Sequence, residues 1–157
     1  GSENGLARCY HGLGDLSRAT GDLEGAAGWF ERSLDYCRRT GDAHLLLEGH
    51  LELAHALILS DGPSERIEPH LTHGMRIAEN MAATGAVSSV HTLCEALASA
   101  YVRRNNPERA IHFFRRSFDF GPHPSPERPL QKLEPLYAGL GRSEEFTEFA
   151  RLIRRDG

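Results

Sequence analysis

Apolar residues recur along the chain at spacings of three and four, which is the period of an α-helix. One such stripe runs through Leu93, Leu97, Ala100 and Tyr101. No segment sustains the alternation of apolar and polar residues that is typical of a strand. The pattern therefore predicts an all-α protein with eight helices joined by short turns, over residues 4–20, 23–40, 43–60, 64–84, 87–104, 107–120, 126–140 and 143–155.

Capping residues and glycines mark the ends of these helices. Asp22, Asp42 and Asn106 stand where a helix begins, and a side-chain oxygen there can accept a hydrogen bond from a first-turn N–H. Glycine is the usual residue just past a helix end, because it adopts the left-handed conformation without strain. We expect helix ends at Gly21, Gly41, Gly62, Gly85, Gly121 and Gly141.

The helices repeat in pairs. Residues 13–34 align with residues 97–118 without a gap, pairing Gly14 with Ala98, Ala26 with Ala110 and Phe30 with Phe114. Small residues let two antiparallel helices approach closely, so we expect Gly14 to face Ala26. Looser copies start at Leu53 and Leu133. The prediction is a single domain over residues 3–157, built from hairpins at about 4–40, 43–84, 87–120 and 126–155.

This repeat resembles the tetratricopeptide repeat, and the resemblance implies a right-handed superhelix, or solenoid, of four antiparallel helical hairpins. The anchors Leu13, Leu53, Leu97 and Leu133 are 40, 44 and 36 residues apart, longer than the standard repeat of 34. Such elongated repeats are similar to arrays in large bacterial signalling proteins and transcriptional regulators. The resemblance therefore implies a non-catalytic scaffold for protein binding or sensing, with no cofactor.

Composition narrows the class of protein further. The 157 residues carry a net charge of −4, so nucleic acid and anionic membranes are not the default partners. Three scattered cysteines fit a reducing cytoplasm. Lys132 is the single lysine among 18 basic residues, which suggests a GC-rich bacterium. Gly1 and Ser2 resemble a cloning scar, and without an initiator Met we expect a piece of a longer chain.

Histidines offer the main alternative to a scaffold. His70 and His73 lie three residues apart, and Glu48 follows His44 by four, so each pair shares a helix face. Neither pair has an obvious third ligand nearby in the sequence. A metal-dependent enzyme that uses the second hairpin is therefore the alternative hypothesis, while our prediction names no metal ligand and no catalytic residue.

Other candidate motifs have packing explanations. The string from Gly12 to Gly14 lacks the preceding strand and the third glycine of a dinucleotide-binding loop. Cys9 and Cys94 occupy neighbouring register positions of two first helices, on the stripe expected to face the hairpin core. We therefore expect both cysteines to be buried as small hydrophobic residues rather than to act as nucleophiles.

The inner face of the array is the predicted binding surface, because first helices line the groove of a helical solenoid. Family members that clamp acidic chaperone C-termini use Lys and Asn there, unlike this chain. Four carboxylates against three arginines favour a basic protein segment, which the same parent chain could supply. The predicted groove residues are Arg8, His11, Asp15, Arg18, Glu48, Leu51, Glu52, His55, Thr92, Glu95, Ser99 and Arg103.

The last predicted helix carries more apolar positions than one contact face requires: Phe146, Phe149, Leu152 and Ile153. A terminal repeat of a solenoid needs a polar outer face. We therefore expect weak self-association through this helix, or a further helix of the parent chain against it. A purely structural self-association module is the remaining alternative function.

Overall fold

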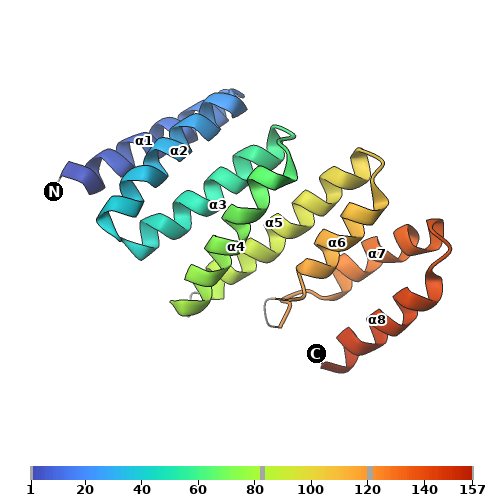
Figure 1. Ribbon diagram of the computed structural model, residues 1–157. Coiled ribbons are helices and arrows are strands. Elements are labelled where there is room, and N and C mark those ends of the chain that lie inside the picture. Colours follow the sequence, from blue (N-terminus) through green and yellow to red (C-terminus); the bar gives the residue numbers. More distant parts are fainter. Residues whose placement is uncertain (1, 82–83, 120–121, 157) are drawn as a thin grey trace. The chain divides into compact units, whose positions relative to one another are not determined.

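The computed structural model describes residues 2–81, 84–119 and 122–156, and these residues form eight α-helices and no strand (Figure 1). The predicted all-α helical repeat is thus confirmed over the described residues. The helices are α1 (Ser2–Ala19), α2 (Leu23–Thr40), α3 (Ala43–Leu59), α4 (Ser64–Asn80), α5 (Thr84–Arg103), α6 (Pro107–Arg116), α7 (Glu127–Gly139) and α8 (Ser143–Asp156).

Local sequence signals account for most helix boundaries. The side chains of Asp22, Asp42 and Asn106 each accept a hydrogen bond from a first-turn backbone N–H, as predicted. Left-handed glycines follow three of the helices, with φ of 86° at Gly21, 68° at Gly41 and 69° at Gly141. These caps satisfy backbone groups that a helix end would otherwise leave without partners.

One predicted glycine end is wrong, and another lies outside the described residues, whereas Gly62 lies just past the end of α3 as predicted. After α3, Asp61 takes the left-handed conformation, with φ of 55°, and the next residue, Gly62, donates its N–H to the Leu57 carbonyl at 2.8 Å. Aspartate tolerates this conformation better than most side chains. Gly85 lies inside α5, whereas Gly121 falls outside the described part of the chain.

The chain divides into two compact units, Gly1–Leu93 and Cys94–Gly157, with the boundary inside α5. In unit 1, α1 packs against α2, α2 against α3, and α3 against α4. In unit 2, α6 packs against α7, and α7 against α8. Each unit therefore builds its own core from helices that are neighbours in sequence.

In hairpin one, formed by α1 and α2, the two helices are in close contact at a glycine. A Cβ atom at Gly14 would lie 2.5 Å from Cε1 of Phe30, and the nearest three atoms all belong to that ring. The closest contact of Gly14 is therefore with Phe30, which lies one turn of α2 after the predicted neighbour Ala26. Ser33 donates its hydroxyl to the Ala7 carbonyl at 2.8 Å, so a buried polar bond ties the same two helices.

Aromatic rings support both units. In hairpin one, Tyr10 of α1 stacks on Trp29 and Tyr36 of α2, with ring centroids 5.9 and 5.6 Å apart. In unit 2, Tyr101 of α5 stacks on Phe113 of α6 at 5.5 Å, with the ring planes within 8° of parallel. Such offset pairs add stability beyond the burial of their area.

Helix α1 buries a different face from the one predicted. Cys9 is exposed, and Leu13 and Leu16 expose 40% and 61% of their surface, while Ala7 is buried together with Gly14, whose burial was predicted. Among the described residues, α1 packs on α2 and more lightly on α3, so its opposite side has no helix against it. The expected burial of Cys94 is confirmed.

Helix α8 exposes less apolar surface than its sequence suggests. Phe146 is buried, and Phe149 and Ile153 are half-buried, so that only Leu152 of this predicted set is exposed, at 47%. Phe149 lies edge-on against Phe118, with ring centroids 5.6 Å apart. None of the helices in the described ranges is long and apolar enough to span a bilayer.

Replacing Gly14 with alanine should destabilise the protein, because the new methyl group would overlap the Phe30 ring. Gly28 of α2 is the matched control, since a Cβ there meets nothing within 4 Å. We expect Gly28→Ala to stabilise by about 0.5–1 kcal/mol and Gly14→Ala to be less stable than Gly28→Ala by ~1–3 kcal/mol. Urea denaturation measures the difference, and equal stabilities would contradict the packing described.

Candidate functional site

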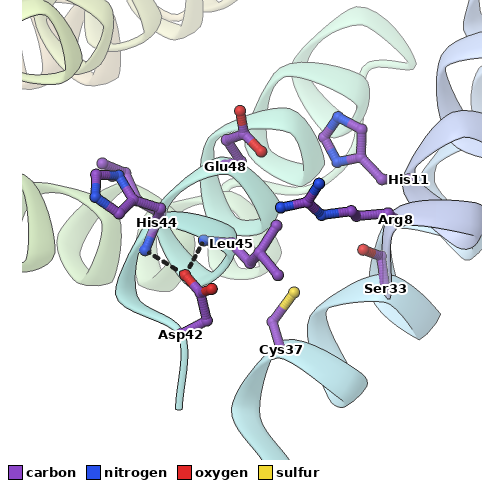
Figure 2. Close-up of a pocket in the computed structure, with 9 residues that line it drawn as sticks. Arg8, His11, Ser33, Cys37, Asp42, His44, Leu45 and Glu48 are labelled. Atoms are coloured by element: carbon purple, nitrogen blue, oxygen red, sulfur yellow. Dashed lines mark hydrogen bonds between the residues drawn. The ribbon is translucent and has the colours of Figure 1, made fainter. Parts of the chain in front are cut away.

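A cavity of about 760 Å³ opens between α1, α2 and α3 in unit 1 (Figure 2). The turn at Gly41 and the cap at Asp42 bring the start of α3 back over the end of α2. The cavity brings together three of the predicted groove residues, Arg8, His11 and Glu48. It is lined by Arg8, His11, Ser33, Cys37, Asp42, His44, Leu45, Leu47 and Glu48.

Several lining groups are already engaged within the protein. The Ser33 hydroxyl binds the Ala7 carbonyl, and Asp42 accepts the N–H groups of His44 and Leu45 at 3.0 and 3.1 Å. Cys37 is buried, and burial raises the pKa of its thiol. A protonated, buried thiol is a weak nucleophile, so these residues shape the cavity wall.

Two charges of opposite sign face the opening. Arg8 of α1 and Glu48 of α3 are exposed, and Figure 2 shows both side chains directed into the same space. Neither has an ion-pair partner among the described residues. Leu45 is half-buried beside them. The cavity therefore offers a cation, an anion and apolar surface to a ligand.

Other predicted groove residues are occupied with one another. Arg18 donates to Asp15 at 2.8 Å, forms an ion pair with Glu52, and lies 3.3 Å from His55 Nδ1. Burial, reinforced by the Arg18 charge, lowers the pKa of His55. His11 lies 3.5 Å from Asp15. Arg18 offsets only part of the acidic charge, because it is shared by Asp15 and Glu52, and the acidic groove stays a prediction.

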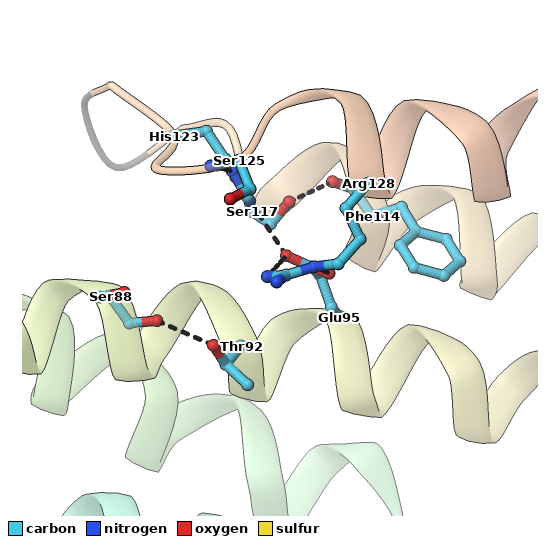
Figure 3. A network of polar contacts seen from close by, with 8 residues as sticks. All are labelled: Ser88, Thr92, Glu95, Phe114, Ser117, His123, Ser125 and Arg128. Carbon is cyan, nitrogen blue, oxygen red and sulfur yellow. Dashed lines mark hydrogen bonds and ion pairs between the residues drawn. The ribbon is translucent and has the colours of Figure 1, made fainter.

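Glu95 is also misplaced by the sequence prediction, because it is buried rather than open to a groove (Figure 3). Arg128 binds it through two hydrogen bonds, Nε to Oε2 at 2.7 Å and Nη2 to Oε1 at 2.9 Å. His123 Nδ1 accepts the Ser125 N–H, so its Nε2 carries the proton and donates to Glu95 at 3.0 Å. Glu95 thus joins α5 to the segment that leads into α7.

The four remaining predicted groove residues serve varied roles. Leu51 is half-buried against α4, since a Cβ at Gly74 would lie 3.0 Å from Leu51 Cδ2. Thr92 is exposed and donates its hydroxyl to the Ser88 carbonyl at 3.1 Å. The last two members of the set are Ser99, which is half-buried, and Arg103, which is exposed.

Three histidines meet between α3 and α4. The Nδ1 atoms of His50 and His70 share a hydrogen bond of 3.0 Å. The ring centroids of His50 and His73 lie 5.2 Å apart. Burial, then the neighbouring His70 and His73, lower the pKa of His50 to about 4. No group of three or more His, Cys, Asp or Glu within the described ranges is arranged to hold a metal ion.

Sequence reasoning missed most of the cavity wall and the partner of His70. The spacing to Glu48 singles out His44. Ser33 and Cys37 lie four residues apart on one face of α2, but the spacing alone does not show that this face meets α1 and the start of α3. His50 offers a usable signal, because it lies in α3 opposite the histidine-rich α4. To find this histidine contact from the sequence, one must know that α3 packs against α4, because residue spacing within a single helix does not reveal it.

The helical hairpins define an all-α repeat protein, and two tetratricopeptide repeat family models match one segment each, residues 6–40 and residues 93–117. The chain therefore carries tetratricopeptide repeats, one formed by α1 and α2 and another by the end of α5 with α6. Repeats of this family generally act as protein-interaction scaffolds and are typically non-catalytic. No curated protein sequence shows significant similarity to the chain.

Three solved structures align with most of this chain at low sequence identity. MamA protein aligns at 16% identity over 96% of this chain and 91% of its own, with a TM-score of 0.38. The nearly identical TPR-like repeats attributed to a Podosopora anserina kinesin light chain align at 18% identity, over 97% of this chain and 96% of theirs, with a TM-score of 0.43. A variant of the same repeats aligns at 17% identity, over 98% of this chain and 96% of its own, with a TM-score of 0.44.

Acidification should destabilise unit 1 through its histidine cluster. The folded-state pKa of His50 is about 4, below the ordinary 6.5, so the unfolded chain binds more protons between these values. Stability is therefore full above pH 6.5 and falls as the pH drops toward 4. We expect His50→Leu to melt with a weaker dependence on pH between 7 and 5 than the wild type. His44→Gln, at an exposed position of the same helix, should keep the wild-type slope.

Removing the Glu95 carboxylate should destabilise unit 2. Glu95→Ala leaves the buried His123 N–H and part of the Arg128 charge without an acceptor, at a cost of ~2–4 kcal/mol. Glu48→Ala removes an exposed carboxylate and should change stability by less than about 0.5 kcal/mol. Thermal and urea unfolding followed by circular dichroism compare the two, and similar losses would contradict a structural role for Glu95.

Proposed function

We propose that this chain is a non-catalytic module that binds a peptide segment of a protein partner in the cavity between α1, α2 and α3. The observation that carries the proposal is the pair of open charges, Arg8 and Glu48, directed into one concave space in unit 1 (Figure 2). Tetratricopeptide repeats generally serve protein interaction, which supports this class of function.

The ligand that suits this cavity carries charges of both signs. Arg8 suits a carboxylate, Glu48 suits a basic side chain, and Leu45 supplies apolar contact. A basic segment, expected from the sequence, would find Asp15 and Glu52 already sharing Arg18, whereas Glu48 is open. Exposed charge pairs contribute only ~0.2–1 kcal/mol each, so binding should be modest and should weaken as salt is added.

The proposal also covers the kind of protein that contains this module. The elongated spacing of the repeats supports a place in a larger bacterial regulatory protein of the cytoplasm, where the module would bind or sense a segment of another protein or of the parent chain. Identifying the domains encoded on either side of this segment tests that setting independently of the cavity.

A random peptide library displayed on phage supplies the probe for the cavity. We expect sequences selected on the wild-type chain to share an acidic and a basic residue close together. Both Arg8→Glu and Glu48→Lys should weaken binding of a selected synthetic peptide by about tenfold or less, in line with one exposed pair. Fluorescence anisotropy at low and high salt measures the change, and wild-type affinity should fall with salt.

Charge reversal elsewhere is the control. Glu148→Lys and Arg151→Glu change an exposed pair on α8, outside unit 1, and should leave affinity unchanged. A double variant that reverses both cavity charges, Arg8→Glu with Glu48→Arg, should bind the selected peptide more weakly than either single variant, because both pairs become repulsive. Selected peptides that bind every variant equally would contradict the cavity as the binding site.

A further inference from the structure

The histidine contact between α3 and α4 is built around one shared proton. His50 is 4% exposed, His70 is half-buried, and their Nδ1 atoms lie 3.0 Å apart in a hydrogen bond. Only one of these two nitrogens carries a proton, because the other must present its lone pair. Whichever ring donates, the hydrogen bond therefore requires that the other ring keep its Nδ1 unprotonated.

The pair can bind one more proton without losing this hydrogen bond. When Nε2 of the donor ring binds a proton, the ring becomes cationic and still donates from Nδ1. A charged donor also makes a stronger hydrogen bond than a neutral one. Half-buried His70 suits the role of cationic donor, and buried His50 suits the role of neutral acceptor. The first proton therefore leaves α3 and α4 in contact.

A second proton is incompatible with the packed helices. It would have to bind Nδ1 of His50, which would set two N–H groups and two positive charges against each other across 3.0 Å. In the open state both rings can be cationic, because water separates and solvates them. Protonation of both rings therefore favours separation of α4 from α3.

The surroundings of the pair also oppose a second positive charge. The only carboxylate among the neighbouring groups, that of Glu31, already accepts a hydrogen bond from Arg66 at 2.8 Å. Burial and these neighbours lower the pKa of His50 to about 4 and also lower the pKa of His70. The charged and titratable groups that act on the three histidines come from α2 and α4: Glu31, Arg38, Arg66, His73 and Arg76.

Helix α4 has weaker local support than the two helices before it. Its N-cap residue, Pro63, makes no side-chain capping hydrogen bond, whereas Asp22 and Asp42 cap α2 and α3. Pro69 lies inside α4 directly before His70, and proline has no N–H to donate to the preceding turn. Segments with weak local support open at a lower free energy than the rest of a domain. Loss of the histidine contact should therefore release α4 before the rest of unit 1.

We propose that the His50–His70 contact is a pH switch, which keeps α4 packed on α3 with one added proton and releases α4 when both rings are protonated. An open α4 lets both histidines bind protons at their ordinary pKa of 6.5, so opening becomes more favourable as the pH falls from 6.5 toward 4. The switch does not use the cavity charges Arg8 and Glu48, so it is independent of the peptide binding proposed above.

Hydrogen exchange measured by mass spectrometry tests the switch, once protection factors are corrected for the intrinsic pH dependence of exchange. Between pH 7 and 5 we expect the amides of α4 to lose protection by about tenfold or more. At pH 5 they should be less protected than the amides of α1 and α2. Unchanged protection of α4 would overturn the proposal. Equal protection of all three helices at pH 5 would also overturn it, because unit 1 would then open as a whole.

Two asparagine variants of α4 separate the switch from other effects of acid. In His70→Asn, an amide oxygen can accept a hydrogen bond from Nδ1 of His50 whether His50 is neutral or cationic. We therefore expect α4 of His70→Asn to lose most of its dependence on pH. His73→Asn removes an exposed histidine one turn further along α4 and should behave like the wild type. Equal behaviour of the two variants would contradict the switch.

Imidazole nitrogen chemical shifts of the wild type, measured by NMR, supply a test that needs no variant. We expect Nε2 of His70 to bind the first proton while Nδ1 of His50 stays unprotonated. The second protonation should coincide with the loss of protection in α4. A first proton on His50, or protonation of both rings while α4 stays protected, would overturn the proposal.

Discussion

The contact between Gly14 and the Phe30 ring is the constraint on which the rest of unit 1 depends. Because a ring carbon of Phe30 occupies space where any Cβ at position 14 would lie, α1 and α2 are held at one distance and one rotation. That rotation fixes which residues of α1 turn inward. Arg8 and His11 then face the cavity, and Leu13 and Leu16 face away from the hairpin. One steric contact therefore separates a polar surface from an apolar one on a single helix.

Two arginines determine how much of the predicted acidic surface stays available. Arg18 pairs with Asp15 and Glu52 in unit 1, and Arg128 holds Glu95 by two hydrogen bonds in unit 2. The buried Glu95 depends on its partners, because a carboxylate removed from water without compensation is costly. Glu48 has no such partner among the described residues and keeps its charge exposed. The availability of a carboxylate to a ligand therefore depends on whether an arginine already pairs with it, and not only on the number of acidic residues.

The positions of the helices could be predicted because the signals that specify them are local. Which side of each helix is buried could not be predicted in the same way. The caps at Asp22, Asp42 and Asn106 act within one turn, so the chain itself specifies them. The exposure of Leu13 depends on which helices surround α1, and no local pattern carries that information. The same holds for the burial of Glu95, which requires His123 and Arg128 from a distant part of the sequence. For the candidate site, helical register found Arg8, His11 and Glu48, but residues at the hairpin ends required the folded arrangement.

The aromatic stack of hairpin one gives the protein a natural optical probe of one unit. Trp29 is the single tryptophan of the chain, and it lies half-buried against Tyr10 with Arg32 over its ring. Its emission therefore reports the loss of hairpin one, while far-ultraviolet circular dichroism follows the helices of both units. Coincident transitions from the two signals would mean that the units unfold together, and separate transitions would mean that each has its own cooperative melting.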